Sequence, residues 1–174
     1  MSGQGWWLGA PNPQLEQGDV FGDIPFIFTV APIQPLIGET IKGNRQVWAP
    51  RPVTDQVGGS SSSYLSNGRR SAGLLLNHGC DIDKGHNRRL SFAAVGPISA
   101  LPKEHQGPVI TQQTAAMLYL PDLPGIGDAY ADLRILACVP SELAERDKRV
   151  ASMSPEAIVR LQAQIVTFFL RKEL

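Results

Sequence analysis

Residues 71–99 read SAGLLLNHGCDIDKGHNRRLSFAAVGPIS, and this stretch decides the fold class. Two short apolar runs, residues 72–76 and 90–95, lie on either side of a polar segment. Apolar runs of this length, bounded by Gly and Asn or Asp, are typical of buried strands. Segments that connect strands often carry the reactive side chains of a protein. The stretch therefore predicts a β-rich core, with one candidate functional segment at residues 77–86.

Composition limits the class of protein further. The chain has 174 residues, of which 43% are hydrophobic and 18% charged, as expected for one globular domain. Its 16 basic and 16 acidic residues cancel, so nucleic-acid binding would depend on a local basic patch. No apolar run has membrane-spanning length, and the first ten residues lack the pattern of a secretory signal. Since Cys80 and Cys138 are the only cysteines, we expect a cytoplasmic protein without a disulfide framework and without a membrane partner.

The chain divides into an arm, a domain and an insertion. Residues 1–17 form an N-terminal arm whose Trp6 and Trp7 are expected to cover a core edge or a dimer partner, with base stacking as the alternative. Residues 18–174 form a single domain. Within it, a flexible insertion at about residues 42–70 is rich in Pro, Gly and Ser and ends in Arg69 and Arg70.

Further strands are expected at residues 20–24, 26–30, 115–120 and 129–139. Alternation along the last of these puts Asp132 and Arg134 on the same face, away from the core, at the rim of the sheet. Because both side chains lie on the same face of the strand, they can form an ion pair.

A terminal helix is predicted at about residues 154–171. Ser154 has the place of an N-cap, and Pro155 that of the first helical residue. The apolar stripe on the helix is wide, which predicts that it packs over the open end of a barrel, with a dimer contact by part of it as the alternative. The stripe consists of Ile158, Leu161, Ile165 and Phe168, widened by Val166, Phe169 and Leu170.

The order of these elements resembles the MazF/PemK family of toxin-like proteins. The resemblance is carried by four segments, 18–21 (Gly-Asp-Val-Phe), 72–77, 92–99 and 131–135. It spans about residues 18–170, and it lies in order and pattern rather than in one rare motif. It implies a mainly β fold, a small, strongly bent SH3-like β-barrel with a C-terminal α-helix.

The resemblance also implies a function. It predicts a homodimer that binds RNA or an antitoxin-like partner protein and cleaves RNA without a metal or other cofactor. Ser99 matches the family's Thr/Ser position, and Arg70 stands one residue before the position of its catalytic arginine. In this interpretation Arg70 stabilises the phosphate and Ser99 positions or protonates it. Binding residues are then Arg69, Asp132 and Arg134, and the last two converge with Arg70 and Ser99 on one concave surface.

The polar segment at 77–86 has its own interpretations. His78, Cys80, Asp81, Asp83 and His86 have donor atoms suited to a transition metal, but the spacing of a zinc site is missing. Cys80 with either histidine is a possible nucleophile pair of a hydrolase or transferase, oriented by Asp81 or Asp83. The favoured interpretation is a structural turn with a buried Cys80 and a capping Asp. His78 and Asp81 are retained as candidate binding residues, and no metal is expected.

Three functions therefore remain open on the sequence. The first is an RNA-binding barrel protein with endoribonuclease activity of the toxin type. The second is a non-catalytic interaction module on the same fold, favoured by the neutral charge, the displaced Arg70 and the wide terminal helix. The third is a hydrolase or transferase that depends on Cys80 and a histidine.

Overall fold

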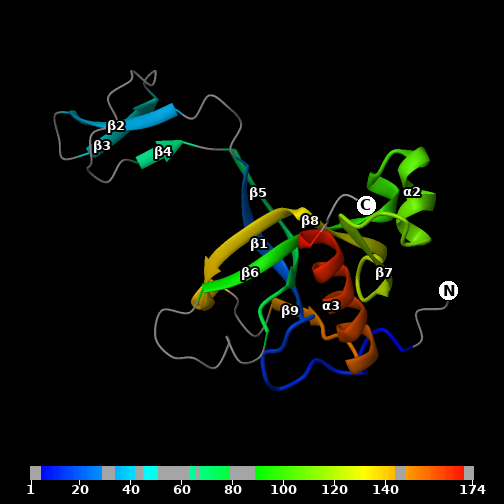
Figure 1. Cartoon of the computed structure of the whole chain (residues 1–174). Coiled ribbons are helices and arrows are strands. Elements are labelled where there is room, and N and C mark those ends of the chain that lie inside the picture. The colour runs from blue at the N-terminus through cyan, green and yellow to red at the C-terminus, as the bar shows by residue number, and fades with distance from the viewer. Residues whose placement is uncertain are drawn as a thin grey trace. The chain divides into compact units, whose positions relative to one another are not determined.

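The computed structural model describes the backbone of residues 5–28, 34–41, 45–50, 63–65, 67–78, 89–143 and 148–170. These residues form two compact units, which are described separately below: Met1–Phe26 with Arg70–Leu174, and Ile27–Arg69. The elements in chain order are β1 (Val20–Phe28), β2 (Gln34–Ile41), β3 (Arg45–Pro50), β4 (Ser63–Leu65), β5 (Asn67–Leu75), β6 (Arg89–Pro97), the 3-10 turn η1 (Ile98–Ala100), α2 (Lys103–Ile110), β7 (Met117–Leu123), β8 (Gly127–Pro140), η2 (Ser141–Leu143), β9 (Arg149–Ala151) and α3 (Pro155–Phe169) (Figure 1).

The larger unit is built on a six-stranded sheet with the order β7-β8-β6-β5-β1-β9. The strand pairs β5–β6, β6–β8, β7–β8 and β1–β9 are all antiparallel. The mainly β class and the terminal helix are thus confirmed. The expected closure into a barrel is wrong, because β7 and β9 stand at the two edges of an open sheet.

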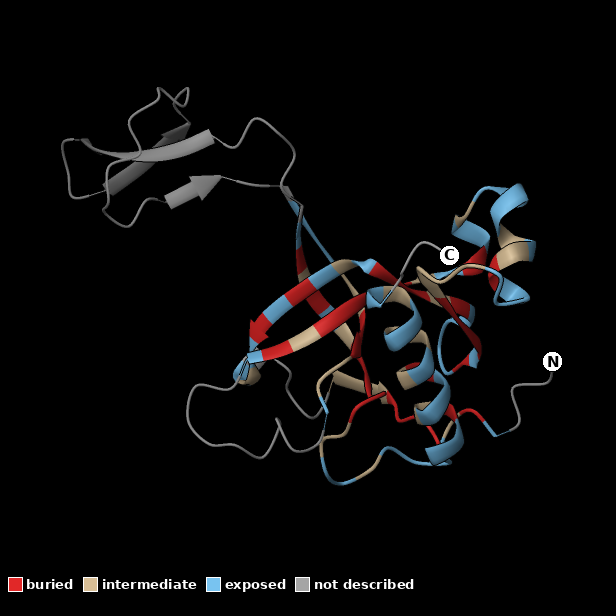
Figure 2. Ribbon diagram, in the orientation of Figure 1, coloured by how far each residue is buried: buried red, intermediate tan, exposed pale blue. Residues whose placement is uncertain are grey.

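Helix α3 packs against the sheet. Its N-terminus is capped as predicted, since Ser154 accepts a hydrogen bond from the backbone N–H of Ala157. Leu161 is fully buried in a cluster with side chains from both edges of the sheet, including Leu118 of β7 and Ala151 of β9. The edges are therefore joined through the buried helix face, and the opposite face of α3 is exposed (Figure 2). Burial of apolar surface at ~25 cal/mol per Å² stabilises this arrangement.

Strand β8 bends sharply at its centre. Ala93 of β6 pairs with Leu136 and Ala94 with Asp132, so residues 133–135 are extra on the β8 side. A bulge of this kind bends a strand and redirects its side chains. The predicted alternation holds for most of β8, where Leu133 is buried and Arg134 is exposed. Asp132 departs from it, because the carboxylate lies at the bulge and is buried.

The N-terminal arm packs against the larger unit. Trp6 is buried in the core cluster, and its carbonyl accepts a hydrogen bond from the backbone N–H of Ser154. Trp7 forms an isolated bridge with Met153, and its indole N–H donates to the carbonyl of Pro121 at 2.8 Å. The prediction that these tryptophans cover a core edge is confirmed by these contacts.

The smaller unit has a sheet of its own, with the order β3-β2-β4 and antiparallel pairing. Its boundaries, Ile27–Arg69, begin earlier than the insertion expected at about 42–70. The Pro, Gly and Ser content of this part of the sequence hides the short apolar run that forms β2.

One local prediction needs correction, and two elements were not predicted. The two strands expected at 20–24 and 26–30 are one strand, β1, which passes Asp23 at a φ of 62° without a break. Helix α2 was not predicted, because its Gly107 and Pro108 make its sequence a poor helix signal. Strand β9, three residues long, carries too short a pattern to detect. Among the described residues, no helix has the length and apolar character needed to cross a membrane.

Candidate functional site

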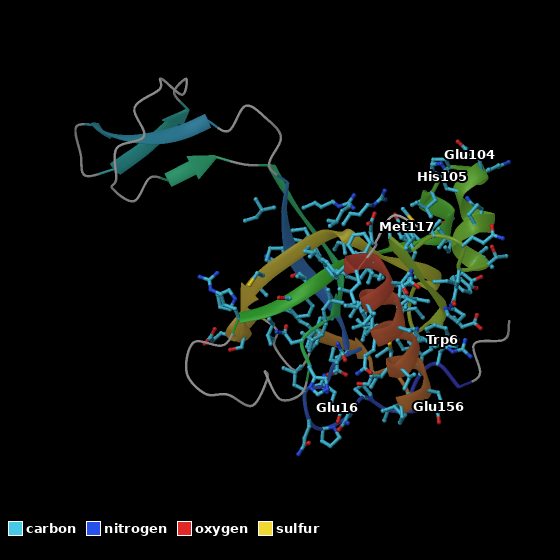
Figure 3. All side chains as sticks on the ribbon, viewed as in Figure 1. Trp6, Glu16, Glu104, His105, Met117 and Glu156 are labelled. Atoms are coloured by element: carbon cyan, nitrogen blue, oxygen red, sulfur yellow. The ribbon has the colours of Figure 1, made fainter. Side chains whose placement is uncertain are left out.

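A pocket of about 210 Å³ lies between α2, the start of β7 and the bend of β8. Its apolar walls come from Pro108, Val109, Ala116 and Met117. Its polar lining comes from His105, Thr114 and Arg134. Figure 3 shows His105 on α2 and Met117 at the beginning of β7, on the side of the sheet where α2 lies.

Arg134 is held in a fixed direction by Asp132. Its Nε donates to Oδ1 of Asp132 at 2.9 Å and its Nη2 donates to Oδ2 at 2.7 Å, a bidentate pair. The Asp132 side chain is 7% exposed and that of Arg134 is 56% exposed, so a buried carboxylate orients an exposed guanidinium. The hydrogen bonds to Asp132 raise the pKa of Arg134 above its ordinary value. The predicted pairing of these two residues is confirmed, and the bulge explains why it forms.

The walls of the pocket are anchored on both sides. Val109 of α2 is fully buried in a small cluster with Ile98 of η1 and Tyr119 of β7. The segment between α2 and β7 is fixed by Gln164 of α3, whose Nε2 donates to the carbonyls of Thr114 and Ala115 at 2.9 and 2.7 Å. These contacts preserve the shape of the pocket without a ligand.

A second polar cluster surrounds Asp23 on β1. Arg70 of β5 donates through Nε to the Asp23 carboxylate and through Nη2 to the Asp23 carbonyl. Lys148 lies 3.9 Å from the same carboxylate. The hydrogen bond from Arg70 lowers the pKa of Asp23 and raises the pKa of Arg70. Two cations thus share one exposed carboxylate.

The other predicted site residues lie in different places. Ser99 is an exposed residue of η1, and Arg69 is exposed in β5. His78 follows β5 and is exposed. Among the described residues, no hydrogen bond or ion pair joins Arg70 or Ser99 to the Asp132–Arg134 pair. The predicted convergence of all four side chains on one surface stays a prediction.

Of the candidate nucleophile and its partners, His78 alone belongs to the described residues. Cys80, Asp81, Asp83 and His86 lie outside the described residues. The residue at the entrance to this segment has a structural role, because Oδ1 of Asn77 accepts a hydrogen bond from the backbone N–H of Ser91. Within the described ranges, no group of three or more His, Cys, Asp or Glu side chains is arranged to hold a metal ion.

A buried ion pair escaped the sequence analysis. Asp19 of the Gly-Asp-Val-Phe segment accepts hydrogen bonds from the backbone N–H of Glu16 and from the hydroxyl of Ser152, and it lies 3.2 Å from Nη1 of Arg149. Burial raises the pKa of Asp19, against the opposing effect of its hydrogen bonds and of Arg149. The signal was present, since an Asp between Gly and a buried strand needs partners when it is buried.

Comparisons with known proteins give no identification. No protein-family model matches the chain, and neither do any curated protein or solved structure. The resemblance to the MazF/PemK family therefore stays a prediction.

Proposed function

We propose that this protein binds single-stranded RNA, with Arg134 as a phosphate contact. The observation that carries the proposal is the orientation of Arg134 by Asp132 beside an apolar pocket. Among the described residues, Nη1 of Arg134 has no hydrogen-bond partner, so one edge of the guanidinium remains for a ligand. Arginine suits this role because its charge is permanent and its planar donors match phosphate oxygens. The Arg70–Lys148 cluster supports the proposal as a second group of cations.

An exposed arginine beside an apolar pocket suits single-stranded RNA better than it suits a duplex. Proteins that bind single strands combine cations along the backbone with apolar or aromatic surfaces for the bases. The chain has formal net charge +0, so we expect modest affinity that depends on a few phosphate contacts rather than on a broad basic surface.

The test is binding of a labelled single-stranded RNA of about 12 nucleotides, within the usual site size of such proteins. Binding is measured by fluorescence anisotropy in EDTA at several salt concentrations. Arg134→Gln should weaken binding and reduce the salt dependence by about one phosphate contact. Arg89→Gln is the matched control, because Arg89 is exposed and pairs with Pro140 at the far end of β8. Absence of binding at low salt, or equal affinity of the two variants, would overturn the proposal.

Cleavage without metal is the catalytic form of the same proposal, and it assigns roles to Arg70 and Ser99. Attack of the 2′-oxygen on the adjacent phosphorus forms a 2′,3′-cyclic phosphate and breaks the bond to the 5′-oxygen of the next nucleotide. The step needs a cation near the developing charge, a group that takes the 2′ proton and a proton for the leaving 5′-oxygen. Arg70 can supply the cation once it exchanges Asp23 for phosphate, and Ser99 has an exposed hydroxyl. The RNA recovered from the binding assay is run on a gel. Fragments that are lost in both Arg70→Gln and Ser99→Ala would support cleavage, and intact RNA would leave binding alone.

A second candidate, a protein-interaction module, is favoured by the outer face of α3. Val159, Ala163 and Val166 are exposed, with Leu170 at the end of the helix, and their spacings of four, three and four residues form one narrow stripe. This is the spacing of a seam between two packed helices. We propose a second copy of this chain as the occupant, because the stripe carries no charge that would select a different partner. Light scattering tests it, and a strict monomer at high concentration would count against it.

A further inference from the structure

We infer that the pocket beneath α2 takes one nucleobase of the RNA while Arg134 contacts an adjoining phosphate. This inference rests on the proposed RNA binding and names the part of the ligand that this site recognises. It follows from the size of the pocket, the chemistry of its walls and the position of its charged group.

The size of the pocket selects a single ring system. Its volume of about 210 Å³ lies below the range of roughly 300–1,000 Å³ that holds drug-sized ligands. An apolar cavity of about 150 Å³ is large enough for benzene. The pocket thus has room for a pyrimidine or a compact purine, while the sugar and phosphate stay outside.

The walls suit the faces of a base. Pro108 and Ala116 present apolar surface in front of the buried Val109, and Met117 adds a thioether. Thioether sulfur makes favourable contacts with aromatic rings, which fits a flat heterocycle better than it fits an aliphatic chain. A base bound here exchanges water for apolar contact.

Polar groups at the pocket are few and fit the edge of a base. The hydroxyl of Thr114 makes only a long contact of 3.4 Å with the carbonyl of Met117, so it remains able to bond a ligand. His105 is exposed on α2 and offers an imidazole nitrogen. The edge of a base bound in the pocket would form hydrogen bonds with Thr114 and His105.

The position of Arg134 links the base to the backbone. Arg134 lines the same pocket, and Asp132 occupies its Nε and Nη2. Its remaining nitrogen, Nη1, is then the donor for a phosphate oxygen at the mouth. In this arrangement Arg134 contributes affinity for the RNA backbone, and the apolar walls select a base that is not stacked on its neighbours.

The first experiment uses the unaltered protein and small probes. Uridine and adenosine monophosphates are titrated and followed by backbone amide shifts, with ribose 5-phosphate as the probe that lacks a base. We expect the nucleotides to shift the amides of Val109, Ala116 and Met117, and ribose 5-phosphate to leave them in place. Equal shifts from all three probes, or none at these amides, would overturn the base pocket.

The second experiment fills the pocket. Ala116→Leu places extra side-chain volume in it, and Ala115→Leu is the matched control, since Ala115 is the preceding residue and does not line the pocket. We expect Ala116→Leu to weaken RNA binding roughly tenfold, the order of one stacked base, with the salt dependence unchanged. Thermal unfolding checks that both variants are folded.

The two proposals fail in different ways. RNA that binds to Ala116→Leu and Ala115→Leu with equal affinity refutes the base pocket and leaves RNA binding intact. Failure of the unaltered protein to bind RNA at low salt refutes the proposed function, whatever the nucleotide titrations show.

Discussion

Arg149 and Asp19 form a buried ion pair that joins the N-terminal arm to β1 and β9. Nη1 of Arg149 lies 3.2 Å from Oδ2 of Asp19, and the two side chains are 6% and 1% exposed. The same nitrogen donates to the carbonyls of Asn12 and Gln14 in the arm. The Nε of Arg149 is buried without a hydrogen-bond partner among the described residues. The carboxylate of Asp19 is therefore the charge that balances this guanidinium.

Asp19→Asn should destabilise the protein by about 3 kcal/mol, because it leaves the buried charge of Arg149 without a counterion. The amide keeps the shape of the carboxylate, so packing around Phe21 should change little. Urea unfolding measures the loss. Glu16→Gln is the control, and as a change at a half-buried neighbour it should cost less than about 0.5 kcal/mol. Similar stabilities of the two variants would show that the pair contributes little.

Asp23→Asn should release Arg70 and raise the affinity for RNA. Asn tolerates the positive φ of 62° at this position, so the backbone should keep its conformation. The freed cation should increase the salt dependence of binding by about one phosphate contact. Asp122→Asn is a matched control, since it also removes an exposed carboxylate at positive φ. An equal gain in both variants would mean that general charge, and not Arg70, is responsible.

Tyr119→Phe should change the response of the protein to alkali. Burial and the acceptor Asp128 raise the pKa of Tyr119 to about 12 in the folded protein, against about 10 for an unfolded chain. Between these pH values the unfolded chain loses its phenolic proton first, so stability falls as the pH rises through this window.

The fall should be on the order of 1 kcal/mol across the window, less than the ~1.4 kcal/mol per unit of pKa difference would give, because solvent screens the phenolate. Tyr119→Phe removes this contribution and loses the hydrogen bond to Asp128, so it should be less stable near neutrality and less sensitive to alkali. Urea unfolding at several pH values measures both effects. Parallel pH profiles for the two proteins would contradict the assignment.

Val166→Glu should dissociate a dimer formed through α3. Val166 is 53% exposed in the described unit, so the change should leave the stability of the single chain nearly unaltered. A charge at the centre of an apolar seam is costly because it loses water on association. Light scattering over a range of concentrations gives the mass. Thr167→Glu places the same charge outside the stripe and should leave the mass unchanged.

Much of the fold follows from short-range patterns. The paired runs around residues 77–88 predicted β5 and β6, and the Ser154-Pro155 signal predicted the start of α3 to the residue. What could not be predicted depends on partners far away in the chain. The edges of the sheet, and hence the absence of a closed barrel, depend on pairing between strands far apart in the sequence, such as β1 with β9.

The candidate site, too, could be predicted from the sequence only in part. The pairing of Asp132 with Arg134 followed from strand periodicity, although the bulge that buries Asp132 left no local trace in the sequence. The pocket could not be foreseen, because it depends on α2, whose Gly107 and Pro108 conceal the helix. The partner of Arg70 was also missed, since Asp23 lies 47 residues away in the sequence.

The contacts of the arm with α3 have a consequence for the order of folding. The Ser154 hydroxyl bonds the carbonyl of Gly5, a sequence separation of 149 residues, and β9 adds to the edge of the sheet beside β1. These first residues leave the ribosome long before the segment that covers them has been made. The buried face of Trp6 must therefore wait, exposed or transiently covered, until the segment that carries Ser154 and α3 has been made. Such long-range closure slows folding, because the ends of a long loop must meet before the contacts between them can stabilise the core.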